Sequence, residues 1–359
     1  MIRSTFALIA LACAAARAFA EDCAPLKQIA SLETQPLGNS SVMTADAGFN
    51  GTPKPMIVDT GAGISMIREG ALEPLGLHGI RNSNIVMLGG AGAASQSFTE
   101  VTDFTVGTIR VPRAQFQVAP NSSGEAPFVG WLGGDLLSLY DVEIDPAGHR
   151  LNFFAKDHCP GHVLYWHPTG LAVLPIQTQL ATGDASRTGF RSYVYRARSI
   201  YVPVNLAGKD MQAQIDTGAS ASTISAKTAA ALFDVTADSP GSTGQESVDG
   251  DPKHIRFIHT FPTLTFDGVT VTNARFVVYP DLIGAHDPNN TSRTDTRVAK
   301  IDDNLTAANH ISIGMDVLRR LRLFVAFSES KLYVTPATAP LTPVTAAPAT
   351  SLRPLAIGK

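Results

Sequence analysis

The hexapeptide Ile57-Val58-Asp59-Thr60-Gly61-Ala62 decides the fold of this chain, because the sequence contains it twice. Its second copy is Gln214-Ile215-Asp216-Thr217-Gly218-Ala219. In each copy an apolar run ends in an acid, a small hydroxyl residue and a glycine. This pattern is typical of a buried strand that delivers one carboxylate to a tight turn. The repetition predicts that Asp59 and Asp216 are brought to one place.

The sequence around the two copies is duplicated as well. Asp216 lies 157 residues after Asp59 (216 − 59), and Gly268 lies 161 residues after Gly107 (268 − 107). The spacing grows to 181 for Asp135 and Asp316 (316 − 135). The second half therefore carries an insertion of about 21 residues within 281–310, a polar segment typical of a surface loop. Two long units indicate a duplicated lobe and not a solenoid of short repeats.

Length and composition favour two all-β domains. A chain of 359 residues is long enough for two hydrophobic cores. With 30 Gly, 23 Pro and few long amphipathic patterns, it is rich in strand and turn signals. Short helices are predicted near 68–75 and 225–233. The net charge of −3 and the lack of a basic cluster argue against nucleic acid as a partner.

The first 20 residues have the pattern of a signal peptide. Arg3 precedes an apolar run at 6–16, and Ala18-Phe19-Ala20 forms a small-x-small cleavage site. The run is too short to cross a bilayer, and no later stretch is a candidate transmembrane segment. We therefore expect an exported protein, periplasmic or secreted, that begins at Glu21. Lipid modification of Cys13 is a weaker alternative.

Removal of the signal peptide leaves Cys23 and Cys159, which predict a disulfide in an oxidising compartment. Two unpaired buried thiols are the alternative. His158, Cys159 and His162 also have a metal-like spacing, but a disulfide is the better use of Cys159. We expect no metal and no cofactor.

The predicted organisation has two lobes, at 21–155 and 200–335, with residues 21–41 as a polar lead-in. Residues 156–199 connect the lobes, and residues 336–359 form a disordered tail rich in Pro, Ala and Thr.

The two repeats, roughly 42–155 and 200–335, resemble retropepsin-like aspartic proteases, with both lobes fused in one chain as in pepsin-type enzymes. The resemblance rests on the Asp-Thr-Gly-Ala motif in each repeat. It rests also on the later hydrophobic-Gly-x-Asp segments at 132–135 and 313–316. It implies two similar β-barrel lobes with an active-site cleft between them.

The resemblance also implies roles for individual residues. Asp59 and Asp216 would be the catalytic pair, Thr60 and Thr217 would interlock beneath them, and Gly61 and Gly218 would form the substrate-facing turns. A Gly-rich hairpin at 85–98, with Gly89 and Gly90 at its tip, would be a flap, although it lacks the Tyr of pepsin flaps. The polar stretch 239–251 occupies the corresponding place in the second lobe. Asp135 and Asp316 are predicted as helix N-caps.

Paired carboxylates can activate water without a metal or a covalent nucleophile. Two such groups in close contact cannot both ionise cheaply, as is familiar from aspartic proteases, so one acts as base and the other as acid. We therefore expect a monomeric, exported aspartic endopeptidase that cuts a peptide or protein substrate. The alternatives are an inactive duplicate, a non-catalytic module that binds peptides or envelope proteins, and lobes that pair across two chains.

Overall fold

The computed structural model describes residues 23–81, 87–88, 94–119, 125–178, 199–248, 250, 254–280 and 310–337. The predicted signal peptide, Cys13, the flap residues Gly89 and Gly90, and residues 338–359 of the predicted tail lie outside the described residues. No helix within these ranges is long and apolar enough to cross a membrane.

The first repeat consists of short strands with little helix, as predicted. Its elements are β1 (Gln28–Pro36), β2 (Met43–Phe49), β3 (Thr52–Val58), β4 (Met66–Arg68), η1 (Glu69–Ala71), η2 (Glu73–Leu75), β5 (Ile80–Arg81), β6 (Met87–Leu88), β7 (Ala94–Ser95), β8 (Ser97–Val101), β9 (Phe104–Val106), β10 (Ile109–Val111), β11 (Ala114–Ala119), β12 (Gly130–Leu132), α1 (Gly134–Leu137), β13 (Asp141–Asp145) and β14 (Arg150–Phe154).

The connection and the second repeat continue in the same manner. Their elements are β15 (Ala172–Pro175), β16 (Gln177–Thr178), β17 (Ile200–Leu206), β18 (Lys209–Ile215), β19 (Ser222–Ser225), α2 (Ala226–Phe233), β20 (Ser242–Ser247), β21 (Ile255–Phe266), β22 (Val269–Tyr279), β23 (His310–Ile313), α3 (Met315–Leu318), β24 (Leu321–Ala326) and β25 (Lys331–Pro336). The all-β fold with two similar lobes is thus confirmed.

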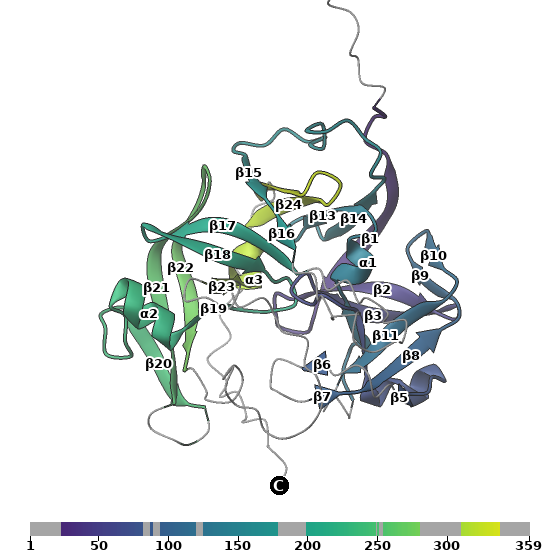
Figure 1. Ribbon diagram of the computed structural model, residues 1–359, viewed down its shortest axis with the longest axis horizontal. Coiled ribbons are helices and arrows are strands. Elements are labelled where there is room, and N and C mark those ends of the chain that lie inside the picture. The colour runs from purple at the N-terminus through teal and green to yellow at the C-terminus, as the bar shows by residue number, and fades with distance from the viewer. Residues whose placement is uncertain are drawn as a thin grey trace, which may run out of the picture.

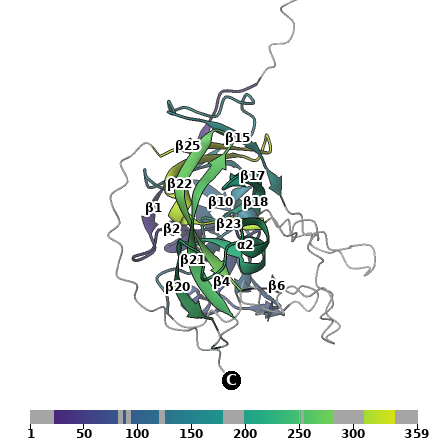
Figure 2. The same ribbon diagram turned by 90° about the vertical axis from the view of Figure 1, so that its left-hand side faces the viewer.

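The duplication is visible in the sheet topology. In the first lobe the order β3-β12-β4-β11 places β12 parallel to β3 and antiparallel to β4. In the second lobe β18-β23-β19-β22 repeats this arrangement, with β23 parallel to β18 and antiparallel to β19. Figure 1 shows the strands of the second lobe, in green, on the left and those of the first lobe on the right. The long β21 and β22 cross the face of the second lobe in Figure 2.

The lobes are joined through six strands in the order β15-β25-β24-β13-β14-β1, which form one end of a 15-stranded sheet that continues into the first lobe. At its centre β13 pairs antiparallel with β24, and Glu143 faces Phe324. Phe324 lies 181 residues after Glu143 (324 − 143), which is the spacing of the repeat in this region. Glu143 and Phe324 are therefore equivalent positions of the two repeats, and they face each other. The lobes therefore meet as two copies of one unit related by a local twofold arrangement.

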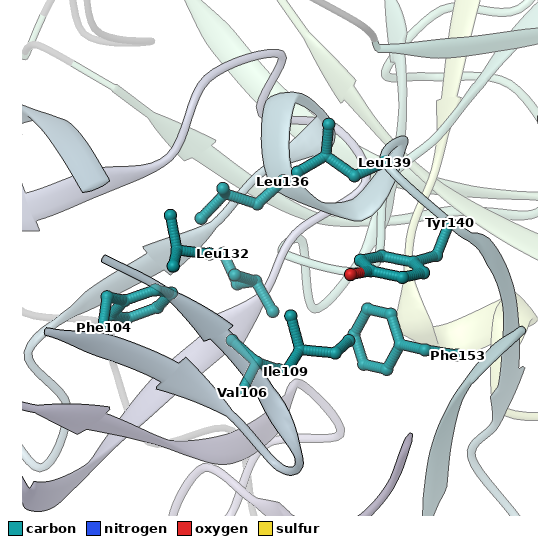
Figure 3. A pocket seen from close by; sticks show the side chains of 9 residues that line it. Phe104, Val106, Ile109, Leu132, Leu136, Leu139, Tyr140 and Phe153 are labelled. Carbon is teal, nitrogen blue, oxygen red and sulfur yellow. The ribbon is translucent and has the colours of Figure 1, made fainter. Parts of the chain in front are cut away.

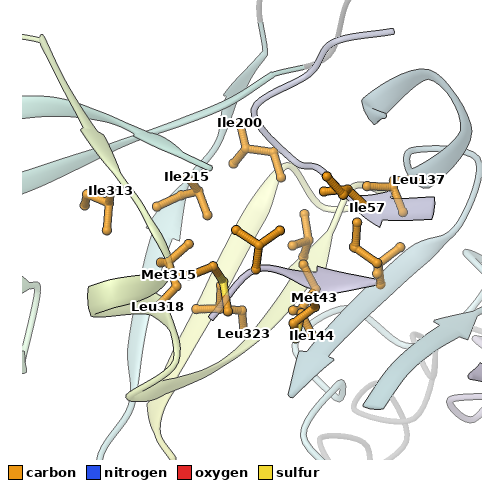
Figure 4. Packing of buried hydrophobic residues seen from close by; sticks show 14 of the residues in the cluster. Met43, Ile57, Leu137, Ile144, Ile200, Ile215, Ile313, Met315, Leu318 and Leu323 are labelled. Atoms are coloured by element: carbon orange, nitrogen blue, oxygen red, sulfur yellow. The ribbon is translucent and has the colours of Figure 1, made fainter. Parts of the chain in front are cut away.

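One hydrophobic cluster runs through both lobes. Met43 and Ile144 of the first lobe belong to the same cluster as Ile215 and Leu323 of the second. Figure 4 shows these side chains gathered where strands of the two lobes converge. Burial of continuous apolar surface across the junction stabilises the relative position of the lobes, and with it the site that they share.

A separate apolar pocket lies inside the first lobe, between strands and α1. Leu136 and Leu139 line one side of it, and Tyr140 stacks edge-on against Phe153 with 5.9 Å between ring centroids (Figure 3). Its lining includes Leu132 but neither Asp59 nor Asp216. This pocket is therefore part of the core and not of the site described below.

Three local predictions need correction. Residues 28–36 of the predicted polar lead-in form β1, because Ala30, Leu32 and Thr34 alternate inward while polar residues face out. The predicted helix at 68–75 consists of two single 3₁₀ turns, the second of which contains Pro74 and ends at Gly76 with φ of 65°. β25 extends to Pro336, one residue into the predicted tail.

The helix predicted at 225–233 is confirmed as α2. The N-cap is Ser225, whose hydroxyl accepts a hydrogen bond from the Thr228 N–H at 3.0 Å.

Candidate active site

Asp59 and Asp216 each follow the last residue of a buried strand, β3 or β18. The N–H of Asp59 donates to the carbonyl of Leu132 at 3.0 Å, and that of Asp216 donates to the carbonyl of Ile313 at 3.0 Å. Each acid is thus held by the parallel strand beside it, at the point where the chain leaves the sheet.

The turn after each acid wraps around its carboxylate. Asp59 Oδ1 accepts hydrogen bonds from the N–H groups of Gly61 (2.9 Å) and Ala62 (2.8 Å). Asp216 Oδ1 accepts from the equivalent N–H groups of Gly218 and Ala219, both at 3.0 Å. These bonds fix one oxygen of each carboxyl and leave the other oxygen directed away from its own turn.

Thr60 and Thr217 lock the two turns together. The Thr60 N–H donates to Thr217 Oγ1 at 3.1 Å, and the Thr217 N–H donates to Thr60 Oγ1 at 3.2 Å. Each hydroxyl then donates into the opposite lobe at 2.6 Å, Thr60 to the carbonyl of Ile215 and Thr217 to that of Val58. Both side chains are buried, so a residue without a hydroxyl would leave polar backbone groups unpaired.

Gly61 and Gly218 allow the carboxyls to approach. A Cβ on Gly61 would lie 2.4 Å from Asp216 Cγ, and a Cβ on Gly218 would lie 2.4 Å from Asp59 Cγ. Such distances are shorter than any van der Waals contact. Only glycine lets each turn lie against the acid of the other lobe.

A second layer of hydrogen bonds supports each turn from behind. Asp135 Oδ1 accepts from the N–H (2.8 Å) and the hydroxyl (2.6 Å) of Ser65, and the Ser65 hydroxyl accepts from the Gly133 N–H at 2.9 Å. In the second lobe Asp316 Oδ1 accepts from Ser222 at 2.9 and 2.7 Å, and Ser222 accepts from the Gly314 N–H at 3.0 Å.

The N-cap prediction for Asp135 and Asp316 is therefore wrong. The N-caps are Gly133 and Gly314, whose extended backbone places each acid inside the first helical turn. From there the carboxylate reaches the serine of the Asp-Thr-Gly segment. The sequence signal for these serines was the repeat itself, because each lies six residues after its Asp, but sequence reasoning did not use it.

The electrostatics of the pair follow from burial and proximity. Asp59 is only 9% exposed, and burial followed by the charge of Asp216 raises its pKa to about 7. Burial also raises the pKa of Asp216, which shares a hydrogen bond with the Asp59 carboxyl. The two groups therefore titrate as a unit and hold one proton between them in a range that ends near pH 7, where Asp59 loses its proton.

Three side chains make the two lobes contribute differently to the site, and none of the three was predicted from the sequence. The carbonyl of Gly61 accepts hydrogen bonds from Ser199 Oγ (2.8 Å) and from Gln214 Nε2 (3.0 Å). The hydroxyl of Ser312 donates to Asp216 Oδ2 at 3.5 Å. None of the three is repeated in the first lobe, where Val42, Ile57 and Trp131 stand at the corresponding places, so no repeat signal could reveal them.

The other predicted site residues are placed as follows. Cys23 and Cys159 are joined by a disulfide across 136 residues of sequence. Met87 and Leu88 of the Gly-rich hairpin pair with Ser95 and Ala94, while its tip lies outside the described residues. The polar stretch at 239–251 contains β20, which forms a hairpin with β21.

A zinc site at His158, Cys159 and His162 would need the thiolate of Cys159 as a ligand, but this sulfur is bonded to Cys23 in the disulfide. Among the described residues, no group of three or more His, Cys, Asp or Glu side chains is arranged to hold a metal ion.

Comparison with known families decides the classification. The family model described as aspartyl protease matches residues 45–136 and 202–317, one match in each lobe. The chain belongs to the aspartyl protease family. The family matches include Asp59 and Asp216 and the later Asp135 and Asp316, the residues around which each lobe is built.

Among solved structures, this aspartyl protease is similar to basic 7S globulin from soybean, at 10% identity and a TM-score of 0.47, over 88% of this chain and 98% of that one. It is also similar to the aspartic proteinase from Irpex lacteus, at 13% identity and a TM-score of 0.47, over 87% of this chain and 98% of that one. No curated protein matches the sequence.

Proposed function

We propose that this aspartyl protease hydrolyses internal peptide bonds, with water activated between Asp59 and Asp216. The observation that carries the proposal is the hydrogen-bonded pair itself. The Asp59 carboxyl is buried and the Asp216 carboxyl is partly buried; they come from different lobes and share a hydrogen bond, and Oδ1 of each accepts two backbone N–H groups. Such a pair holds one ionised and one protonated carboxyl at the same time, as acid and base catalysis on a carbonyl requires.

In the proposed reaction the ionised carboxylate removes a proton from water, and the water oxygen bonds to the carbonyl carbon of the scissile peptide. The protonated carboxyl gives its proton to the carbonyl oxygen, so the intermediate is a neutral gem-diol. Collapse of this intermediate re-forms the carbonyl, breaks the C–N bond and transfers a proton to the leaving amine. The pair returns to one proton shared between two carboxyls, so atoms and charges balance.

The rigid support of the pair favours this reaction over simple binding. The reciprocal threonine bonds and the two Ser-Asp supports hold both carboxyls in place before any substrate arrives. Preorganised polar groups of this kind lower the barrier because they need not reorient as charge develops.

We also propose that the enzyme acts after export and as a monomer. The Cys23–Cys159 disulfide supports an oxidising compartment, and the N-terminal pattern supports export through a signal peptide. Both acids come from one chain, so the site is complete without a second copy. Peptides or unfolded segments of proteins are the proposed substrates.

The test is a cleavage screen with the full chain against a complex peptide library, from about pH 3 to about pH 8. A variant with both Asp59→Asn and Asp216→Asn, purified in the same way, controls for contaminating proteases. We expect internal cuts by the parent and none by the variant. Folded parent protein that produces no cut at any pH would contradict the proposal. Retention of peptides without cutting would instead indicate a binding module.

A further inference from the structure

The second lobe places a hydroxyl group beside its acid that the first lobe lacks. Ser312 lies on β23, in register with Gln214 of β18 and Thr223 of β19. From there its hydroxyl donates to Asp216 Oδ2 at 3.5 Å, the oxygen that the turn N–H groups do not bind. Asp216 thus has hydrogen-bond donors on both of its oxygens.

The equivalent position in the first lobe is Trp131. It lies on β12 in register with Ile57, as Ser312 does with Gln214. Its indole packs edge-on against Phe128, with 5.2 Å between ring centroids. Within the described part of the chain, the side chain that hydrogen-bonds Asp59 is that of Asp216. Asp59 therefore has no counterpart to the Ser312 hydroxyl.

The remaining titratable groups near Asp216 do not reverse this difference. Burial and the charge of Asp216 raise the pKa of Tyr201 on β17 above its ordinary value of 10.0. Its hydroxyl is therefore neutral at every pH at which the acid pair holds a proton. The ring of His310 packs against Tyr201 at 5.8 Å, and burial lowers the pKa of this histidine, which favours its neutral form. Neither group adds a charge that would favour ionised Asp59.

We propose that Ser312 is a positioning residue that keeps Asp216 as the ionised carboxylate and leaves the shared proton on Asp59. This inference rests on the proposed function and assigns the two roles within it. Asp216 then takes the proton from water, and Asp59 donates to the substrate carbonyl oxygen. A hydroxyl donor stabilises an ionised carboxylate, whereas the deeper burial of Asp59 favours its neutral form. The rise in the pKa of Asp59 to about 7 agrees with this assignment.

The assignment makes a prediction about which limb of the pH profile depends on Ser312. If Asp216 ionises first, loss of the hydroxyl destabilises the active form relative to the doubly protonated form. The acid limb then moves to higher pH. Because Asp216 is also ionised in the doubly deprotonated form, the alkaline limb stays where it is. If Asp59 ionised first, the alkaline limb would move instead.

The experiment compares pH profiles of kcat/KM for the parent, Ser312→Ala and Ser312→Thr. We expect Ser312→Ala to move the acid limb up by about 0.5 to 1 pH unit, because the Ser312 bond is long, at 3.5 Å, and a typical hydrogen bond contributes about 1 kcal/mol. Ser312→Thr keeps the hydroxyl and should restore the parental profile. Thr223→Ala, at the cross-strand partner of Ser312, serves as the matched control and should leave both limbs unchanged. Movement of the alkaline limb alone, or of neither limb, would overturn the inference.

A carboxyl titration separates this inference from the proposed function, because it needs no turnover. The full chain with ¹³C-labelled aspartate carboxyls is titrated by NMR, with Asp59→Asn and Asp216→Asn used to assign the two signals. We expect Asp216 to titrate at the lower pH and to move upward in Ser312→Ala. If Asp59 titrates first, the inference is wrong even if the enzyme cuts peptides. If no peptide is cut but Asp216 titrates first, only the proposed function fails.

Discussion

Thr60 and Thr217 are reciprocal partners: each donates its N–H to the hydroxyl of the other, at 3.1 and 3.2 Å. Through these bonds two turns that lie 157 residues apart in sequence become one rigid unit. The hydroxyls complete the arrangement by donating at 2.6 Å to carbonyls of the opposite lobes. The geometry of the acids above depends on this unit, which leads to the first prediction.

Thr60→Ala should destabilise the protein and reduce its activity. Loss of Oγ1 leaves the buried N–H of Thr217 without its acceptor and the carbonyl of Ile215 without its donor. We expect a loss of about 2–4 kcal/mol in the free energy of unfolding, measured by urea denaturation. Thr60→Ser retains the hydroxyl and should lose far less. Equal stability of the Ala and Ser variants would show that the hydroxyl bonds do not hold the lobes together.

Gly218→Ala should impair catalysis more than stability. Its new methyl group would lie 2.4 Å from Asp59 Cγ, so the acid must move away from its partner. We expect kcat/KM to fall by about 100-fold, the order of effect seen when a reacting group is misplaced by about 1 Å. Gly79→Ala is the control, because its Cβ would meet Leu72 Cδ1 at an ordinary 3.8 Å. Similar activities for the two variants would contradict the close approach described for the acids.

The acid pair should make the protein less stable as the pH rises from about 4 to about 7. In the unfolded chain each Asp loses its proton near its ordinary pKa of 3.8, whereas in the folded chain the pKa of Asp59 is raised to about 7. The folded state binds more protons in this window, so raising the pH favours unfolding. Asp59→Asn should weaken this dependence, leaving the part that comes from Asp216, and should raise the free energy of unfolding at pH 7.5 by roughly 2–4 kcal/mol. Urea denaturation across the pH range measures it, and parallel curves for parent and variant would refute it.

His158 should stabilise the junction of the lobes at acidic pH. Its Nε2 lies 2.6 Å from Asp141 Oδ2 on β13, and the Ser328 N–H beside β24 donates to Asp141 Oδ1 at 2.9 Å. Burial alone would lower the pKa of His158. The hydrogen bond to Asp141, the Cys159 carbonyl and the charges of Asp141 and Glu329 outweigh burial and raise the pKa.

A raised histidine pKa contributes stability that is fully present below the unfolded value of 6.5 and is lost as the pH rises through the folded value. We therefore expect His158→Gln to cost about 3 kcal/mol at pH 5.5, where the buried Asp141 loses its cationic partner and keeps its hydrogen bonds from Ser328, and less at pH 8.5. His78→Gln, at an exposed histidine, is the control. A loss that does not depend on pH would contradict the ion pair.

The sequence was sufficient to predict the parts of the site that are repeated. Asp59 and Asp216, the threonines and the glycines all belong to a motif written twice, and the structure places them together. Ser65 and Ser222 are also repeated and could have been predicted from the 157-residue spacing. The helix caps were misassigned because glycine with extended backbone occupies the cap, which sequence preference alone does not favour.

The residues of the site that could not be predicted are ones that the first lobe does not repeat. Ser312 reaches Asp216, and Ser199 and Gln214 reach Gly61, because of strand register and lobe contact that are set by the folded chain. The pairing of Glu143 with Phe324 across the lobes likewise depends on packing of two finished units. Strand β1 was missed because its inward residues are small or few, which gives a weak alternating pattern.

The central claim is that Asp59 and Asp216 act as one catalytic unit. The most direct test measures kcat/KM on one cleaved peptide for the parent, Asp59→Asn, Asp216→Asn and the double variant. Asp46→Asn and Asp238→Asn, at exposed acids, serve as controls. We predict that each single variant loses at least about 10³-fold and that the double variant is no worse than either. A single variant that cuts at the parental rate, or losses that multiply in the double variant, would contradict the account.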